Sequence, residues 1–150
     1  MKNKSFRIAF FYVLIFSILT TTSSCSERNE TVNCFPNVSV SVIVNLNLPA
    51  YFNLQTVGGW IYLDEQSSGT RGLIVVRTTT GFKIYDRNAP HICPSSDTTL
   101  NVVNNIKIVC SKDNAEWILL TGQPTAVANI PPKTYPYSYN QNSNILTIYN

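Results

Sequence analysis

Hydrophobic and polar residues alternate over residues 38–48. Val or Leu occupies every second position, Ser and Asn stand between them, and Ile43 is the one exception. Because successive side chains of a β-strand point to opposite faces, this pattern predicts a long strand with one buried face. Pro49 follows and has no backbone N–H to donate, so we expect the strand to end there.

Shorter apolar runs, separated by turn residues, continue along the chain. The uninterrupted run at 73–76 is typical of a strand buried on both faces, and the turn at 78–81 predicts a hairpin with residues 82–85. Further strands are predicted at residues 60–63, 100–103, 106–110, 117–120, 135–139 and 145–149.

Two further turns favour hairpins. Asn104 and Asn105 tolerate the left-handed backbone of a tight turn, and the polar segment 141–144 separates the last two predicted strands. No segment after residue 25 sustains a helical period. We therefore expect an all-β fold of antiparallel sheets.

The N-terminal 25 residues have the three-part layout of a signal peptide. A basic start is followed by an apolar stretch at 8–19 and then by small polar residues, which predicts a signal peptide over residues 1–24. The apolar stretch is short for a membrane-spanning helix, which takes roughly 20 residues. The alternatives are an ordinary secretory signal and an uncleaved anchor helix.

The end of this segment, Ser23-Ser24-Cys25, resembles the lipobox of bacterial lipoproteins. The resemblance implies that Cys25 becomes the lipidated first residue of an exported protein, anchored on a periplasmic or cell-surface face of a membrane. Residues 25–35 would then form a flexible tether, and residues 36–150 the folded domain.

Composition indicates one compact domain, and charge excludes one class of partner. The chain has 150 residues, 44% of them hydrophobic and 13% charged, which suits a single globular unit. Lys2, Lys4 and Arg7 account for the net charge of +3, since the other basic residues balance the eight acidic ones. Nucleic-acid binding needs uncompensated basic clusters, so we expect no nucleic-acid partner.

The sequence offers little for catalysis. His91 is its single histidine, and no serine lies in a nucleophile elbow. Zinc-protease, phosphate-loop and calcium-loop motifs are also missing from the sequence. We therefore expect a protein that is not an enzyme.

Two loop segments, at 85–94 and 108–117, resemble the Rieske iron–sulfur family, which carries C-P-H in one loop and C-P-x-H-G in the next. Aligned on His91 and Cys110, the family's other Cys falls at Ala89 and its other His at Asp113, and the expected aromatic residue is Trp117. The end of the first predicted strand, Asn45-Leu46-Asn47-Leu48-Pro49, also resembles that of small Rieske-like bacterial lipoproteins.

The Rieske resemblance covers roughly residues 36–150 and implies a fold. It implies antiparallel sheets forming a partial barrel, with loops 87–99 and 110–116 adjacent at one tip.

The Rieske resemblance also raises the question of whether the chain keeps the ligands of an iron–sulfur cluster. A Rieske [2Fe–2S] cluster takes two Cys and two His ligands, and Ala89 and Asp113 replace one of each. We therefore expect no cofactor and a non-catalytic structural or interaction module, with its protein partner unidentified. The alternatives are an electron-transfer protein with a [2Fe–2S] centre and a zinc site formed by His91, Cys93, Cys110 and Asp113.

The resemblance further implies a cysteine pairing. Rieske proteins join their two cluster loops by a disulfide, which implies a Cys93–Cys110 bond in an oxidising compartment. Cys34 is then free, paired outside the chain, or the true partner of one of the other two.

Several aromatic residues, among them Tyr51 and Phe52, could serve a core or a binding surface. Tyr135, Tyr137 and Tyr139 alternate along one predicted strand, and we expect most of these rings to be structural. A row of the three on the solvent face would instead indicate a binding surface.

Overall fold

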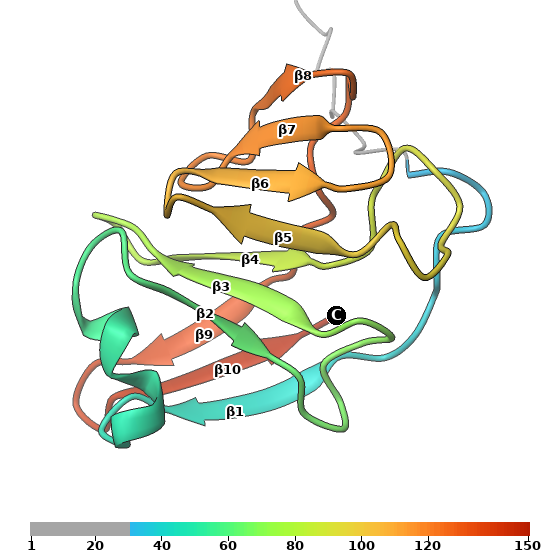
Figure 1. Cartoon of the computed structure of the whole chain (residues 1–150). Coiled ribbons are helices and arrows are strands. Elements are labelled where there is room, and N and C mark those ends of the chain that lie inside the picture. Colours follow the sequence, from blue (N-terminus) through green and yellow to red (C-terminus); the bar gives the residue numbers. More distant parts are fainter. Residues whose placement is uncertain (1–30) are drawn as a thin grey trace, which may run out of the picture.

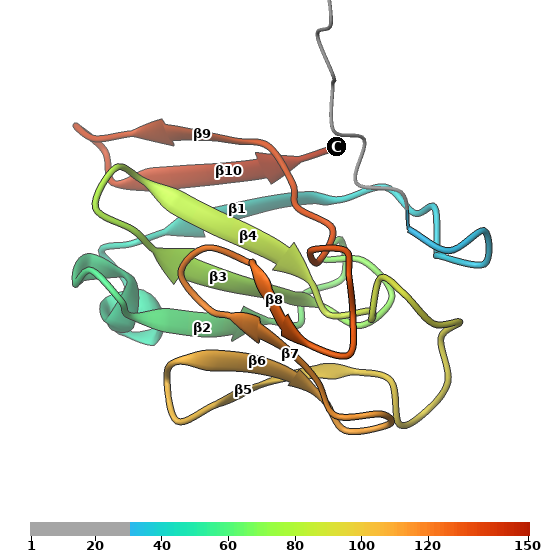
Figure 2. The ribbon, with the colours of Figure 1, turned by 90° about the horizontal axis from the view of Figure 1, so that it is seen from above.

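The computed structural model describes residues 31–150, which form three antiparallel sheets stacked in layers (Figures 1 and 2). The expected all-β fold is confirmed. The sheet orders are β1-β10-β9, β2-β3-β4 and β5-β6-β7-β8. The strands are β1 (Ser41–Asn45), β2 (Trp60–Leu63), β3 (Leu73–Arg77), β4 (Phe82–Asp86), β5 (Leu100–Val103), β6 (Lys107–Cys110), β7 (Ala115–Ile118), β8 (Pro124–Ala126), β9 (Tyr137–Asn140) and β10 (Ile145–Tyr149).

The middle sheet, β2-β3-β4, has a hydrophobic core on each of its faces. In β3, Leu73 and Val75 point into the core shared with β1 and β10, while Ile74 and Val76 point into the core shared with β5, β6 and β7. All four side chains are fully buried. The uninterrupted apolar run predicted as a doubly buried strand is therefore β3, confirmed by its position between two layers.

The tight turns of two predicted hairpins are confirmed. β5 and β6 pair across Asn104 and Asn105, whose φ angles are 53° and 57°. Ile106 N–H donates to Val103 O, and both central residues of this turn have the positive φ of a type I′ turn, which Asn accepts readily. Residues 141–144 connect β9 to β10, and of these Asn144 has a positive φ, of 53°.

The first strand is shorter than its hydrophobic period indicates. Asn45 accepts hydrogen bonds from Leu48 N–H at its carbonyl and from Asn47 N–H at its side chain, which forms a turn. A short 3₁₀ helix, η1 (Pro49–Gln55), follows, which no helical period in the sequence had indicated. Pro49 begins this helix, because its fixed φ suits a first helical position, rather than ending the strand.

One edge strand escaped prediction. β8 begins at Pro124 and pairs only with β7, with a register shift beside Trp117. Proline is tolerated there because an edge strand leaves one row of backbone groups unpaired.

The tyrosines at 135–139 are structural, as expected. Tyr135 is buried, and Tyr137 and Tyr139 pack partly buried against the first core. Phe82 N–H donates a hydrogen bond to the Tyr137 hydroxyl, and both Tyr137 and Tyr139 make edge-on contacts with the Phe82 ring. These rings therefore join β9 to the middle sheet.

The folded domain begins earlier than residue 36. Val32 N–H donates a hydrogen bond to Pro90 O, and Cys34 is covalently bonded to Cys93. Residues 32–35 thus belong to the domain rather than to the expected tether. The predicted signal peptide and Cys25 lie outside the described residues, and no helix within residues 31–150 is long and apolar enough to cross a membrane.

Candidate functional site

The two predicted tip loops lie side by side at one end of the sheets. The first leads from β4 to β5 and the second from β6 to β7, so the antiparallel strands bring both to the same end. His91 Nε2 in the first loop lies 2.5 Å from Asp113 Oδ2 in the second. This contact confirms the expected proximity of the loops, which we call the tip.

Asp113 accepts hydrogen bonds at both of its carboxylate oxygens. His91 Nε2–H donates to Oδ2, and Ala115 N–H donates to Oδ1 at 3.2 Å. Burial alone would raise the pKa of this carboxyl group, but the donated hydrogen bonds outweigh burial and lower it. Asp113 is therefore an ionised acceptor that joins the two loops.

Only one ring nitrogen of His91, Nε2, has a hydrogen-bond partner within residues 31–150. Its ring lies 5.6 Å from the Trp117 ring, centroid to centroid, and its Nδ1 is buried with no hydrogen-bond partner among the described residues. An ionised carboxylate can only accept hydrogen bonds, so Nε2 of His91 carries the hydrogen atom and is the donor in its bond with Asp113. The ring thus works as a packed hydrogen-bond donor.

Cys110 is a buried thiol. It is the last residue of β6, is fully inaccessible, and packs in the second core with Ala89 and Trp117. Burial, followed by the neighbouring Asp113 carboxylate, raises its pKa, so the sulfur stays protonated and unreactive.

The disulfide joins Cys34 to Cys93, with a Cα–Cα distance of 5.5 Å, and Cys110 is free. The expected Cys93–Cys110 bond is therefore wrong. Cys93 and Cys34 are both exposed, whereas strand alternation turns Cys110 into the core. The sequence allowed Cys34 as a partner, but no local signal places the leading segment against the first tip loop.

The predicted ligand positions do not fit a Rieske cluster. Ala89 is buried in the second core, Cys93 is consumed by the disulfide, and the carboxylate of Asp113 already binds His91. Within residues 31–150 no three His, Cys, Asp or Glu side chains are placed to hold a metal ion together. The four-residue zinc set fails for the same reason, since Cys93 has no free thiolate.

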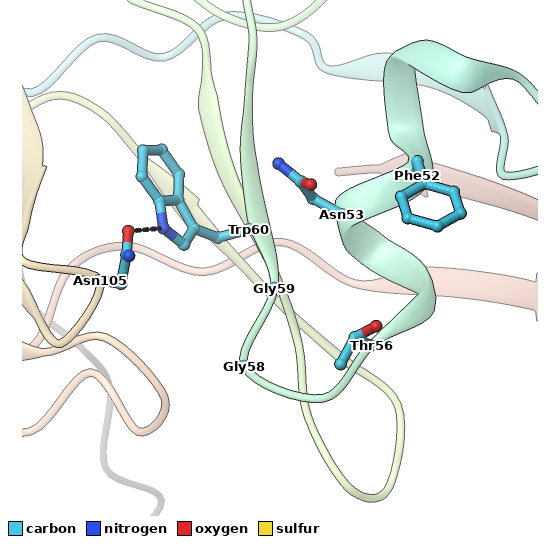
Figure 3. Close-up of a pocket in the computed structure, with 7 residues that line it drawn as sticks. All are labelled: Phe52, Asn53, Thr56, Gly58, Gly59, Trp60 and Asn105. Atoms are coloured by element: carbon cyan, nitrogen blue, oxygen red, sulfur yellow. Dashed lines mark hydrogen bonds between the residues drawn. The ribbon is translucent and has the colours of Figure 1, made fainter.

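A hollow of about 300 Å³ (Figure 3) lies among elements that Figure 1 places at the end of the sheets opposite the tip loops. Its lining comes from η1, the start of β2 and the turn between β5 and β6. We call it the aromatic–amide pocket, lined by Phe52, Asn53, Thr56, Gly58, Gly59, Trp60 and Asn105. None of these side chains carries a charge.

Two glycines shape the aromatic–amide pocket. Gly58 has a φ of +86°, and a Cβ on Gly59 would lie 1.7 Å from Asn53 O. Gly59 is therefore required because the chain passes directly against η1. The dipeptide Gly58-Gly59 before Trp60 is the one sequence signal of this pocket, and by itself it indicates only a turn before a strand.

Trp60 connects two sheets at the edge of the pocket. Its Nε1–H donates to Asn105 Oδ1 at 2.9 Å, across from β2 to the β5–β6 turn. Its ring also meets that of Tyr62 edge-on at 4.9 Å between centroids. Figure 3 shows Trp60 and Phe52 on either side of Gly58, Gly59 and Asn53. From the sequence, Asn105 is predicted only as a residue of the tight turn between two strands.

Fold and side chains together define a small all-β domain with a cross-linked tip and, at the other end, an uncharged pocket. Comparisons with protein-family models, curated proteins and solved structures give no match to this chain. The tip and the aromatic–amide pocket are therefore the features that bear on function.

Proposed function

We propose that the protein is a non-catalytic binding module, exported and held on a membrane by a lipid on Cys25, with a Rieske-like domain that has exchanged its metal centre for structural contacts. The observation that carries this proposal is the fate of the tip residues. Cys93 is cross-linked to Cys34, and His91 donates to Asp113 rather than facing an open ligand position.

The disulfide supports the export part of the proposal. Disulfides form and persist outside the reducing cytosol, and this one is exposed on the surface. The loop that it closes spans 59 residues, which corresponds to about 4 kcal/mol of stabilisation on the chain-entropy model. This cross-link fixes the first tip loop to the leading segment, while the contact between His91 and Asp113 joins the first tip loop to the second.

The second candidate function is electron transfer through a [2Fe–2S] centre. It is favoured only by the side-by-side position of the loops that carry His91 and Cys110. It requires reduction of the Cys34–Cys93 bond and release of Asp113 from His91.

The test is the colour and iron content of the full chain, purified from cells supplied with iron and sulfide. We expect no visible absorption and no bound iron, together with a Cys34–Cys93 cross-linked peptide in a non-reducing digest. About two irons per chain, with free thiols at Cys93 and Cys110, would overturn the proposal in favour of electron transfer.

The anchoring part has its own test. Cys25→Ser should release the protein from the membrane fraction or leave an unprocessed precursor, whereas Cys34→Ser should not change fractionation. A Cys25→Ser protein that fractionates and migrates like the parent would refute lipidation.

A further inference from the structure

The aromatic–amide pocket lies where a tethered domain would offer it to the surroundings. Both views place η1 and the β5–β6 turn at the end of the sheets away from the tip and from residues 31–40 (Figures 1 and 2). In a chain attached to a membrane through its N-terminus, the pocket would therefore lie at the end of the domain away from the attachment point. This orientation rests on the proposed function, whereas the chemistry of the pocket does not.

The lining combines aromatic surface with unpaired polar groups. Phe52 is 65% exposed, and among the described residues neither the Asn53 side chain nor the Thr56 hydroxyl has a hydrogen-bond partner. Asn105 uses Oδ1 for Trp60 and keeps its amide N–H groups free. The pocket thus offers hydrogen-bond donors, acceptors and ring faces at once.

The absence of charge in this lining excludes several ligand classes. A phosphate, nucleotide or acidic sugar would lose its hydration without meeting a cation, which is costly. A proline-rich peptide also docks between aromatic side chains, but here the Trp60 indole N–H is already bonded to Asn105 and is not available to a peptide carbonyl. A neutral ligand with apolar C–H faces and many hydroxyl groups can pack on the aromatic rings of the lining and exchange hydrogen bonds with its amide and hydroxyl groups.

We propose that the aromatic–amide pocket binds a neutral saccharide, with a sugar ring stacked on an aromatic face and its hydroxyl groups bonded to Asn53, Thr56 and Asn105. The volume of about 300 Å³ lies at the lower end of small-molecule sites, which suits one or two sugar units. The pocket is preformed, because Trp60 is held by Asn105 and Tyr62, and a preformed site binds at lower entropic cost.

The experiment presents the purified full chain, in detergent, to an array of neutral hexose and N-acetylhexosamine oligosaccharides printed beside sialylated and sulfated oligosaccharides and proline-rich peptides. We expect binding to neutral saccharides only. Because no charge takes part, it should be equal at low and high salt.

Substitutions locate the binding. Phe52→Ala should weaken it about tenfold, which corresponds to roughly 1.4 kcal/mol, and Thr56→Val should weaken it by a smaller factor while keeping the shape of the side chain. Ile43→Ala is the matched control, because Ile43 is 68% exposed on β1 and lies outside the pocket. Thermal unfolding of each variant shows whether its fold is retained.

Several outcomes would overturn the inference. They are binding confined to acidic glycans or to peptides, binding that survives both Phe52→Ala and Thr56→Val, and no binding at all. A colourless, membrane-anchored protein that ignores every saccharide would refute this inference alone. An iron-containing protein that binds neutral saccharides through Phe52 would refute the proposed function but support the inference that the pocket binds a saccharide.

Discussion

The two ends of this domain are organised in opposite ways. At the tip, polar and sulfur-containing side chains are bonded to one another: His91 to Asp113, and Cys34 to Cys93. At the aromatic–amide pocket, Asn53 and Thr56 are unpaired among the described residues and Phe52 stands exposed. Bonded groups stabilise a fold, whereas unpaired groups on a preformed surface are free to bind. We therefore expect the tip residues to contribute mainly to stability, and the pocket residues mainly to the binding proposed above.

The largest effect on this comparison should come from the disulfide. Cys34→Ser and Cys93→Ser should each lower the free energy of unfolding by about 4 kcal/mol, since either removes the cross-link from the unfolded chain. Urea unfolding of the parent with and without reductant, and of both variants, measures this loss of stability. Reductant should not change the free energy of unfolding of either variant. A peptide map that links Cys110 to any cysteine would contradict the pairing.

A backbone change at the other end should rank second. A methyl group on Gly59 would collide with Asn53 O, so Gly59→Ala should cost about 1–3 kcal/mol by forcing η1 and β2 apart. It should also abolish whatever the pocket binds. Unchanged thermal stability in this variant would mean that η1 is not packed against this turn.

The hydrogen bonds of Asp113 should contribute less. Asp113→Asn should cost about 1–2 kcal/mol by replacing a charged acceptor. The matched control is Asp97→Asn, because Asp97 pairs with Lys112 on the exposed surface, where such pairs contribute little.

The same aspartate predicts a pH dependence. Because the pKa of Asp113 is lower in the folded than in the unfolded state, its contribution is complete above about pH 4 and is lost as the pH falls through the folded pKa. Urea unfolding across this acidic range should show a shallower loss of stability in Asp113→Asn. An identical curve for variant and parent would contradict the assigned hydrogen bonds.

The smallest effect on stability is expected for Phe52→Ala, although this variant should weaken binding about tenfold. Phe52→Ala removes a side chain that is mostly in solvent, so the free energy of unfolding should change by less than about 0.5 kcal/mol. A large loss of stability would place Phe52 with the structural residues and remove the contrast between the two ends.

Local patterns in the sequence determined the strands and their turns. Alternation, the doubly apolar run of β3 and the Asn104-Asn105 turn act through the nearest residues along the chain, so periodicity and backbone preference are enough to read them. Even the error at β1 has a local source. The buried positions continue to Leu46, one residue beyond the strand that ends at Asn45, so the hydrophobic period outlasts the hydrogen-bonded ladder.

Tertiary structure alone decided the cysteine pairing and the pocket. Cys34 and Cys93 meet because the leading segment returns to the first tip loop, 59 residues away in sequence. Phe52, Trp60 and Asn105 line one pocket because η1, the start of β2 and the β5–β6 turn lie near one another at this end of the stacked sheets. Such contacts depend on how whole layers pack, and no window of neighbouring residues carries that information. The sequence by itself therefore determined an all-β chain, while packing between its layers decided which side chains are bonded and which remain free to bind.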